Sequence, residues 1–178
     1  MISVLDKKLR LLDESLSKVI AKLDVADSEI LTYKPGPEKW NAVQILAHLQ
    51  QSETASVAYM NKKLPAIDDQ LKTGFKESYR SFLLKMFLYS PLKFKAPAAF
   101  ANMPEDLVYK EIRDQYFQTR RELREVLSLL NEEHLDRAIM KHPRIGRINA
   151  PQTLDFIASH FEHHRKQIDD RLLRGRKI

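Results

Sequence analysis

The sequence predicts an all-α fold: a four-helix bundle with a long link that holds a short extra helix between the second and third helices. Four long segments repeat apolar residues at helical spacing, which is the main support for this class. The 178 residues include only four glycines, too few for a turn-rich β architecture. Leu, Ala, Glu, Lys, Arg and Gln dominate, and they lose little on entering a helix. Because amphipathic helices bury their stripes by facing inward, we expect one domain over residues 1–178.

Each of the four main helices has a recognisable apolar stripe. The first is expected over residues 3–24, and the second from Asn41, a suitable N-cap, to about residue 62. The third is expected over about residues 105–131. The fourth opens near residues 149–151 (Asn-Ala-Pro), because proline is tolerated in a first helical turn, and runs to the end. The stripes comprise Leu5, Leu9, Leu12, Leu16, Val19, Ile20 and Leu23; Ala42, Ile45, Leu49, Ser56 and Met60; Val108, Ile112, Tyr116, Leu123, Leu127 and Leu130; and Leu154, Ile157, Phe161, Ile168 and Leu172.

The link between the second and third helices, about residues 63–104, is long. It holds a short, very apolar helix expected over residues 75–89, followed by breaks at Pro91 and Pro97. A link of this length suits an up-up-down-down or crossover bundle better than a simple up-down one. Because the extra helix is apolar around most of its circumference, we expect it to be buried or to form an interface. Packing as a dimer interface or as a lid is the main interpretation, with a homodimer expected through residues 75–100 or a bundle face, and attachment to a membrane surface is the less favoured one.

Composition restricts both the chemistry and the setting. The chain has no cysteine, which excludes disulfides, thiolate ligands and a cysteine nucleophile, so any metal site must use His, Asp or Glu. No signal peptide is evident, and no stretch approaches the roughly 18 apolar residues of a membrane span, so we expect a cytoplasmic protein. The net charge of +6 is modest. Its densest cluster, at the C-terminal end, has no interleaved aromatic residues, and we therefore do not expect nucleic-acid binding.

The histidines indicate a metal site. His160 and His164 are four residues apart in the fourth helix, so their side chains emerge on one face, which points toward the bundle interior. His48 lies at the border of the stripe of the second helix, whereas His163 points about 100° away from His164. Three neutral imidazoles suit a Zn, Ni, Fe or Mn ion with open positions for water. The alternative is that they are core histidines, satisfied by neighbouring Tyr or Gln side chains.

Three motifs carry a resemblance to a known family. Residues 39–49 (Lys-Trp-Asn-Ala-Val-Gln-Ile-Leu-Ala-His-Leu) resemble the second-helix signature of the DinB-like superfamily, which includes YfiT-like metal-dependent hydrolases, with Asn in place of the usual Ser. Residues 160–168 resemble its fourth-helix motif, and residues 142–146 its His-Pro-x-x-Gly loop. The resemblance extends over about residues 30–173, but residues 64–104 are unmatched. It implies a metal triad of His48, His160 and His164 inside a bundle that is commonly dimeric.

The reaction is less defined than the site. The main hypothesis is a metal-dependent enzyme acting on a small molecule, either a hydrolase or a thiol-dependent transferase. Since the chain has no cysteine, the thiol would be a low-molecular-weight cofactor. The alternative is a non-catalytic, stress-related protein that binds a metal or a small molecule.

Other side chains near the triad have weaker support. Gln44 and Ser52 flank His48 by one turn each and are possible pocket residues. Trp40 is a further pocket candidate, although an aromatic residue before a helix usually packs against its next turn. Glu53 lies about 140° from His48 around the helix, which makes it a poor fourth ligand. The place of Gln167 in the segment that resembles the fourth-helix motif implies that it supports the ligands or packs.

Overall fold

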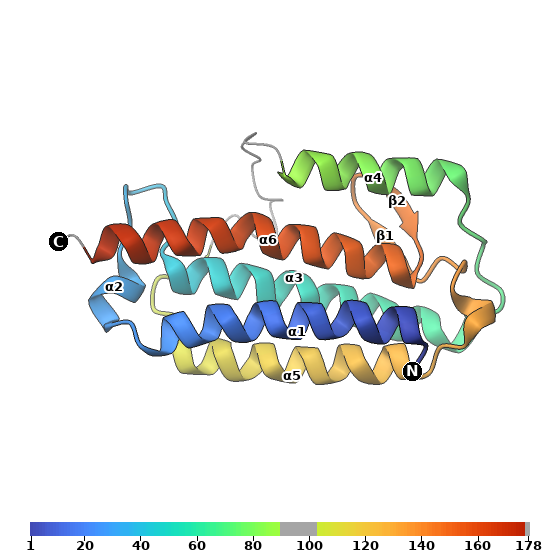
Figure 1. Ribbon diagram of the computed structural model, residues 1–178, viewed down its shortest axis with the longest axis horizontal. Helices are drawn as coiled ribbons and strands as arrows, with labels where there is room; N and C mark the ends of the chain where they lie inside the picture. The colour runs from blue at the N-terminus through green and yellow to red at the C-terminus, as the bar shows by residue number, and fades with distance from the viewer. Residues whose placement is uncertain (90–102, 177–178) are drawn as a thin grey trace.

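The structure, a computed structural model, describes residues 1–89 and 103–176. It confirms the all-α class. Four long helices lie side by side: α1 (Ser3–Asp24), α3 (Ala42–Lys63), α5 (Tyr109–Ser128) and α6 (Ala150–Gly175) (Figure 1). None of the described helices is both long enough and apolar enough to cross a membrane.

The direction of the helices explains the long link. As the colours of Figure 1 show, α3 and α5 run in the same direction and pack together, whereas α1 and α6 run the opposite way. Two parallel neighbours can be joined only by a connection that returns along the length of the bundle. The helix α4 (Phe75–Tyr89) makes that return along the outside of α6 (Figure 1). The connection is thus of the crossover kind that its length predicts.

Both helices that carry the three histidines of interest begin with a capping box. The Asn41 side chain accepts a hydrogen bond from the Gln44 backbone N–H at 2.8 Å, and the Gln44 side chain accepts one from the Asn41 N–H at 3.1 Å. Asn149 and Gln152 repeat the pattern at 3.0 and 3.1 Å. These reciprocal bonds satisfy amides that otherwise lack an intrahelical partner. They fix the first residue of α3 and of α6, and hence which residues face inward.

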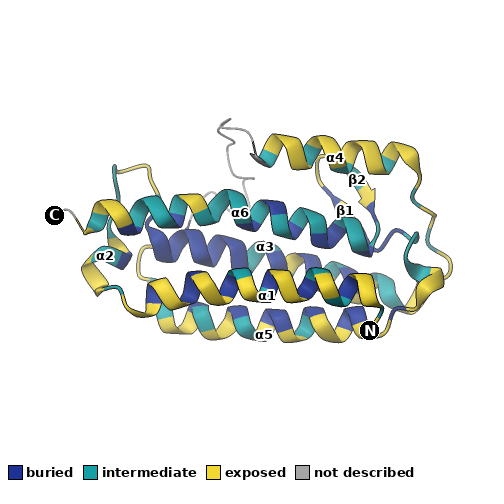
Figure 2. Cartoon of the chain, viewed as in Figure 1, coloured by how far each residue is buried: buried dark blue, intermediate teal, exposed yellow. Residues whose placement is uncertain are grey.

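The predicted stripes form the core. Figure 2 shows α1 and α5 buried on their inner faces and exposed on their outer faces, whereas α3 is buried along most of its length. The buried apolar residues form two main clusters along the bundle. One includes Leu16, Ile45 and Phe161. The other includes Leu9 and Met60, together with Leu127 and Ile157.

Several details depart from the prediction. The third helix begins at Tyr109 instead of residue 105 and ends at Ser128. Val108 is its N-cap and is exposed, so its place in the apolar stripe was wrong. The hairpin of β1 (Met140–His142) and β2 (Gly146–Ile148) was not predicted, and Gly146 adopts a φ of 82° that favours glycine there. The other unpredicted elements are α2 (Ser28–Thr32), η1 (Leu64–Ala66) and η3 (Glu132–His134).

The extra helix α4 has the predicted bounds, but it is not buried within the chain. Leu84 packs against the small cluster around the β-hairpin, whereas Phe75 is 88% exposed and Phe82, Leu83 and Met86 are exposed as well. Exposed apolar area of this kind is typical of a contact surface. The homodimer that we expect from this segment stays a prediction. Pro91 and Pro97 lie outside the described residues.

Candidate metal centre

The packing of α3 against α6 brings three histidines together. His48 projects from α3, and His160 and His164 project from successive turns of α6. The Nε2 atoms of His48 and His160 are 3.2 Å apart. One ring nitrogen from each of the three side chains lies within 4.8 Å of the other two. Within residues 1–89 and 103–176, this is the one group of three or more His, Asp or Glu side chains that could hold a metal ion.

The spacing of the nitrogens fits a metal ion. Zn–N bonds of about 2.0–2.1 Å in a tetrahedral site place two ligand nitrogens roughly 3.3 Å apart. The 3.2 Å between the Nε2 atoms of His48 and His160 is close to that value. The upper limit of 4.8 Å within the group requires only small ring rotations. The described side chains thus offer three nitrogen ligands to one ion.

The protonation states also fit. Burial lowers the pKa of His48 to about 4. Burial, together with the neighbouring His48 and His163, lowers the pKa of His164 to about 3. Burial and the nearby imidazoles also hold the pKa of His160 well below 6.5. At neutral pH all three imidazoles are therefore neutral, and each has a lone pair to offer, as metal binding requires.

Aromatic rings hold two of the three imidazoles in place. The ring of Trp40 lies 5.1 Å from that of His48, between centroids. Phe156 stacks on His160 at 5.5 Å with an interplanar angle of 13°, and His142 packs edge-on against Phe156 at 4.6 Å. Packing of this kind restricts the ring rotations of side chains that must converge on one point.

The three proposed pocket residues have different positions. Trp40 lies beside His48, and Ser52 lines a small cavity together with His160. Gln44 is engaged elsewhere: its side chain belongs to the capping box of α3 and donates to the carbonyl of Pro104 at 2.9 Å. Gln44 is 2% exposed and caps α3, and its place among the pocket residues stays a prediction.

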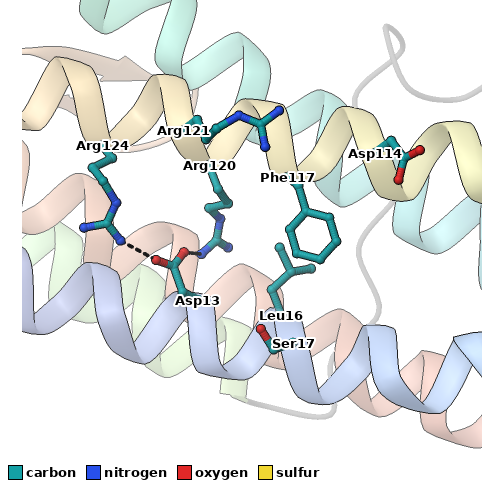
Figure 3. Close-up of a pocket in the computed structure, with 8 residues that line it drawn as sticks. All are labelled: Asp13, Leu16, Ser17, Asp114, Phe117, Arg120, Arg121 and Arg124. Atoms are coloured by element: carbon teal, nitrogen blue, oxygen red, sulfur yellow. Dashed lines mark hydrogen bonds and ion pairs between the residues drawn. The ribbon is translucent and has the colours of Figure 1, made fainter.

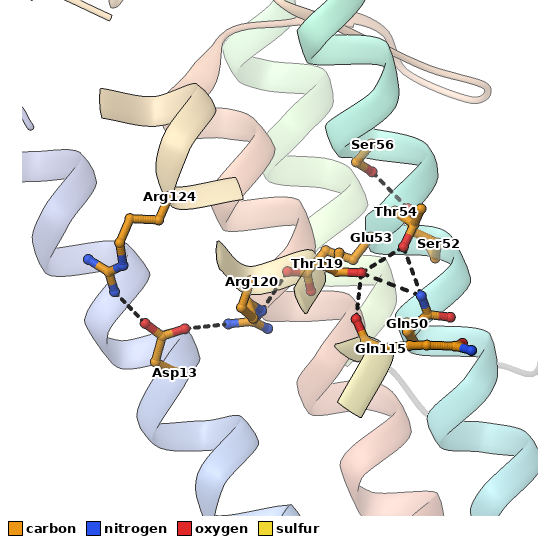
Figure 4. A network of polar contacts seen from close by, with 10 residues as sticks. All are labelled: Asp13, Gln50, Ser52, Glu53, Thr54, Ser56, Gln115, Thr119, Arg120 and Arg124. Atoms are coloured by element: carbon orange, nitrogen blue, oxygen red, sulfur yellow. Dashed lines mark hydrogen bonds and ion pairs between the residues drawn. The ribbon is translucent and has the colours of Figure 1, made fainter. Parts of the chain in front are cut away.

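Sequence reasoning missed a buried charge cluster next to the site. Glu53 and Arg120 are 3% and 5% exposed and form an ion pair at 2.5 Å (Figure 4). Burial raises the pKa of Glu53, and the guanidinium of Arg120 opposes that rise. Glu53 and Tyr116 line the small cavity beside His160. The helical angle of Glu53 makes it a poor fourth ligand, but the angle does not reveal its partner, because Arg120 comes from α5.

A larger cavity, of about 390 Å³, lies between α1 and α5, away from the histidines (Figure 3). Its wall includes Asp13 on α1, which accepts from Arg120 at 3.3 Å and from Arg124 at 2.6 Å. The arginines are thus used in holding α5 to α1. This cavity is larger than the one beside His160, but the convergent imidazoles lie at the opposite interface, between α3 and α6. We place the candidate site there because that is where the ligand chemistry is.

Acid is expected to destabilise the metal-free protein in part through His142. Its side chain is 9% exposed, and burial together with Arg144 lowers its pKa from 6.5 to about 4. Between these values the unfolded chain binds a proton that the folded chain does not, so the free energy of unfolding falls as the pH falls. Going from about pH 7.5 to about pH 5, His142 should contribute a loss of about 2 kcal/mol.

Urea unfolding of His142→Asn at both pH values measures this contribution. The asparagine oxygen can still accept from the Arg144 N–H, which now donates to His142 Nδ1 at 3.2 Å, but the side chain no longer titrates. The variant should therefore lose about 2 kcal/mol less than the parent protein over this pH range. Equal losses would show that His142 is not a source of the acid sensitivity.

Comparisons with known proteins agree with the sequence motifs. The family profile described as the DinB superfamily matches residues 11–168. An uncharacterized protein of Bacillus subtilis, YuaE, is 23% identical over 150 residues, which cover 80% of this chain and 83% of the relative. No solved structure matches the chain significantly.

Proposed function

The chain belongs to the DinB superfamily, and from that premise we propose that it is a metal-dependent enzyme acting on a small molecule. The observation that carries the proposal is the convergence of His48, His160 and His164, with nitrogens within 4.8 Å of one another. Zn, Ni, Fe and Mn are the candidate ions.

The number of ligands favours catalysis over a structural role. Structural zinc sites usually have four protein ligands, whereas catalytic sites have three and keep a position open. Among the described residues, no fourth His, Asp or Glu joins the group. His160 and His164 also keep partial solvent exposure in the part of the chain that the structure describes. Three ligands with partial access are typical of a site that admits a substrate.

The protein's own residues supply binding and orientation. The three imidazoles would hold the ion, and Trp40 and Phe156 pack against the rings of His48 and His160. A divalent ion held in this way supplies Lewis acidity, which polarises a substrate or lowers the pKa of a bound water or thiol. Hydrolysis and thiol-dependent transfer both fit that chemistry. Since the chain has no cysteine, a thiol would have to come from a low-molecular-weight cofactor.

The test compares the metal-loaded, stripped and reloaded protein. Protein purified without chelator should contain about one divalent ion per chain. We expect turnover in a panel of esters, amides and thiol-plus-electrophile pairs only when the ion is present. Circular dichroism should show that the stripped protein remains helical, because the apolar core does not depend on the ion.

Each outcome has a distinct meaning. Full turnover by the folded, metal-free protein would contradict the proposal. Loss of helicity on chelation would make the ion structural. One bound ion without turnover of any compound in the panel would favour the alternative, a non-catalytic metal-binding protein.

A further inference from the structure

A chain of three hydrogen bonds joins the end of α4 to one of the proposed ligands. His163 Nδ1 lies 2.9 Å from the backbone oxygen of Leu88, in the last turn of α4. The Gln167 amide nitrogen lies 3.3 Å from His163 Nε2. The Gln167 amide oxygen lies 3.0 Å from His164 Nδ1. The chain thus runs from a backbone carbonyl of α4, through two side chains of α6, to a metal ligand.

Chemistry allows one arrangement of protons along this chain when the imidazoles are neutral. A carbonyl oxygen can only accept, so Nδ1 of His163 must carry the hydrogen. Nε2 of His163 then accepts, and it takes a hydrogen bond from the Gln167 NH₂ group. The Gln167 oxygen consequently faces His164 and requires a hydrogen on Nδ1 of that ring. His164 is left with its lone pair on Nε2.

We propose that His163 and Gln167 are positioning residues through which α4 sets the tautomer and ring orientation of His164. This rests on the proposed function, because a ring nitrogen of His164 binds a metal only where the hydrogen is absent. An amide has no preference of its own between its two orientations. The hydrogen bond between Gln167 and His163 selects the amide orientation that leaves His164 Nε2 without a hydrogen. The orientation of His163 depends in turn on its hydrogen bond to the Leu88 carbonyl of α4.

The starting point of the chain is suited to this role. The last four carbonyls of a helix have no intrahelical partner, and they lie at the negative end of the helix dipole. The Leu88 carbonyl is in that group, which makes it a ready acceptor for the His163 N–H. Its position depends on the packing of α4 along α6. Displacement of α4 would therefore release His163, then Gln167, and let His164 populate both tautomers.

The test uses His163→Leu, which keeps side-chain bulk but can neither donate nor accept. Nitrogen-15 NMR of the ring nitrogens in the metal-free protein should change from one His164 tautomer, with the hydrogen on Nδ1, to a mixture. The affinity for Zn should fall about tenfold, at the lower end of the 10–100-fold typical for loss of an outer-shell partner. His163→Gln retains a donor and an acceptor and should keep most of both properties.

Gln167→Glu supplies the matched rescue. A carboxylate only accepts, so it should hold the Nδ1 hydrogen of His164 whether or not His163 is present. The double variant His163→Leu, Gln167→Glu should therefore recover the single tautomer, with Gln167→Glu alone as its reference. A purely structural role for His163 would not be rescued in this way.

Two results would overturn the inference: a single Nδ1–H tautomer of His164 in His163→Leu, or a mixture of tautomers in the double variant. The tautomer is measured without metal, so the measurement tests the chain of three hydrogen bonds even if the parent protein binds no ion. Absence of metal binding by the parent protein would instead contradict the proposed function.

Discussion

Alanine at His48, His160 or His164 is expected to lower the affinity for a divalent ion by more than about 100-fold, beyond the effect of losing an outer-shell partner. Each substitution removes one of three nitrogens that lie within 4.8 Å of one another, and the remaining two cannot enclose an ion. Turnover, where it is detected, should disappear together with the metal. Isothermal titration with Zn and metal analysis of the purified variants measure the loss.

His134→Ala is the matched control for the triad. His134 lies in η3 and pairs with Asp68 at 3.1 Å, so it is a histidine that takes no part in the group. Its replacement should leave the affinity for the ion unchanged. A metal content of about one per chain in His164→Ala would contradict the ligand assignment, which stays a prediction until it is measured.

Arg120→Ala is expected to lower the free energy of unfolding by about 3–5 kcal/mol. The substitution leaves the Glu53 carboxylate, 3% exposed, without the guanidinium that lies 2.5 Å from it. It also removes one of the two arginines that Asp13 accepts from across the α1–α5 interface (Figure 3). Urea unfolding followed by circular dichroism measures the change.

Two variants test whether the loss of stability in Arg120→Ala comes from the unpaired buried charge of Glu53. Arg121→Ala removes the neighbouring arginine, which is exposed and hydrogen bonds only to Gln118 among the described contacts, and should change stability by less than about 0.5 kcal/mol. The double substitution Glu53→Leu, Arg120→Met should regain most of the loss, because apolar residues can replace a buried ion pair. Equal stability of Arg120→Ala and the parent protein would show that the pair contributes nothing.

Local patterns account for most of the helical framework. Apolar spacing predicts all four long helices, the apolar run of residues 75–89 predicts α4, and Asn41 is identifiable as a cap, whereas the cap at Asn149 was not predicted. Where the predictions fail, the competing effect is local as well. Val108 precedes the first residue of α5, so helical spacing does not predict which way its side chain points. The three-residue strands of the hairpin are too short for a periodic pattern to show.

The candidate site is only half predictable from sequence. The four-residue spacing places His160 and His164 on one face, and the family motifs connect them with His48. The bonds from Gln44 to the backbone at residues 103 and 104 could not be predicted, because these partners lie about 60 residues further along the chain. The pairing of Glu53 with Arg120 is hidden for the same reason: each residue alone is a charge on a helix.

The sequence by itself determined the long helices, the cap at Asn41 and which histidines share a helical face, because these properties depend on residues within about four positions of one another. Only the tertiary structure showed how closely His48 on α3 approaches His160 on α6, that Glu53 is buried against Arg120, and that the end of α4 reaches His163. Glu53 and Arg120 are 67 positions apart in the sequence, and Leu88 and His163 are 75 positions apart. Contacts over such separations depend on how whole helices pack. A periodic pattern shows that one face of a helix is buried, but it does not show which other helix packs against that face.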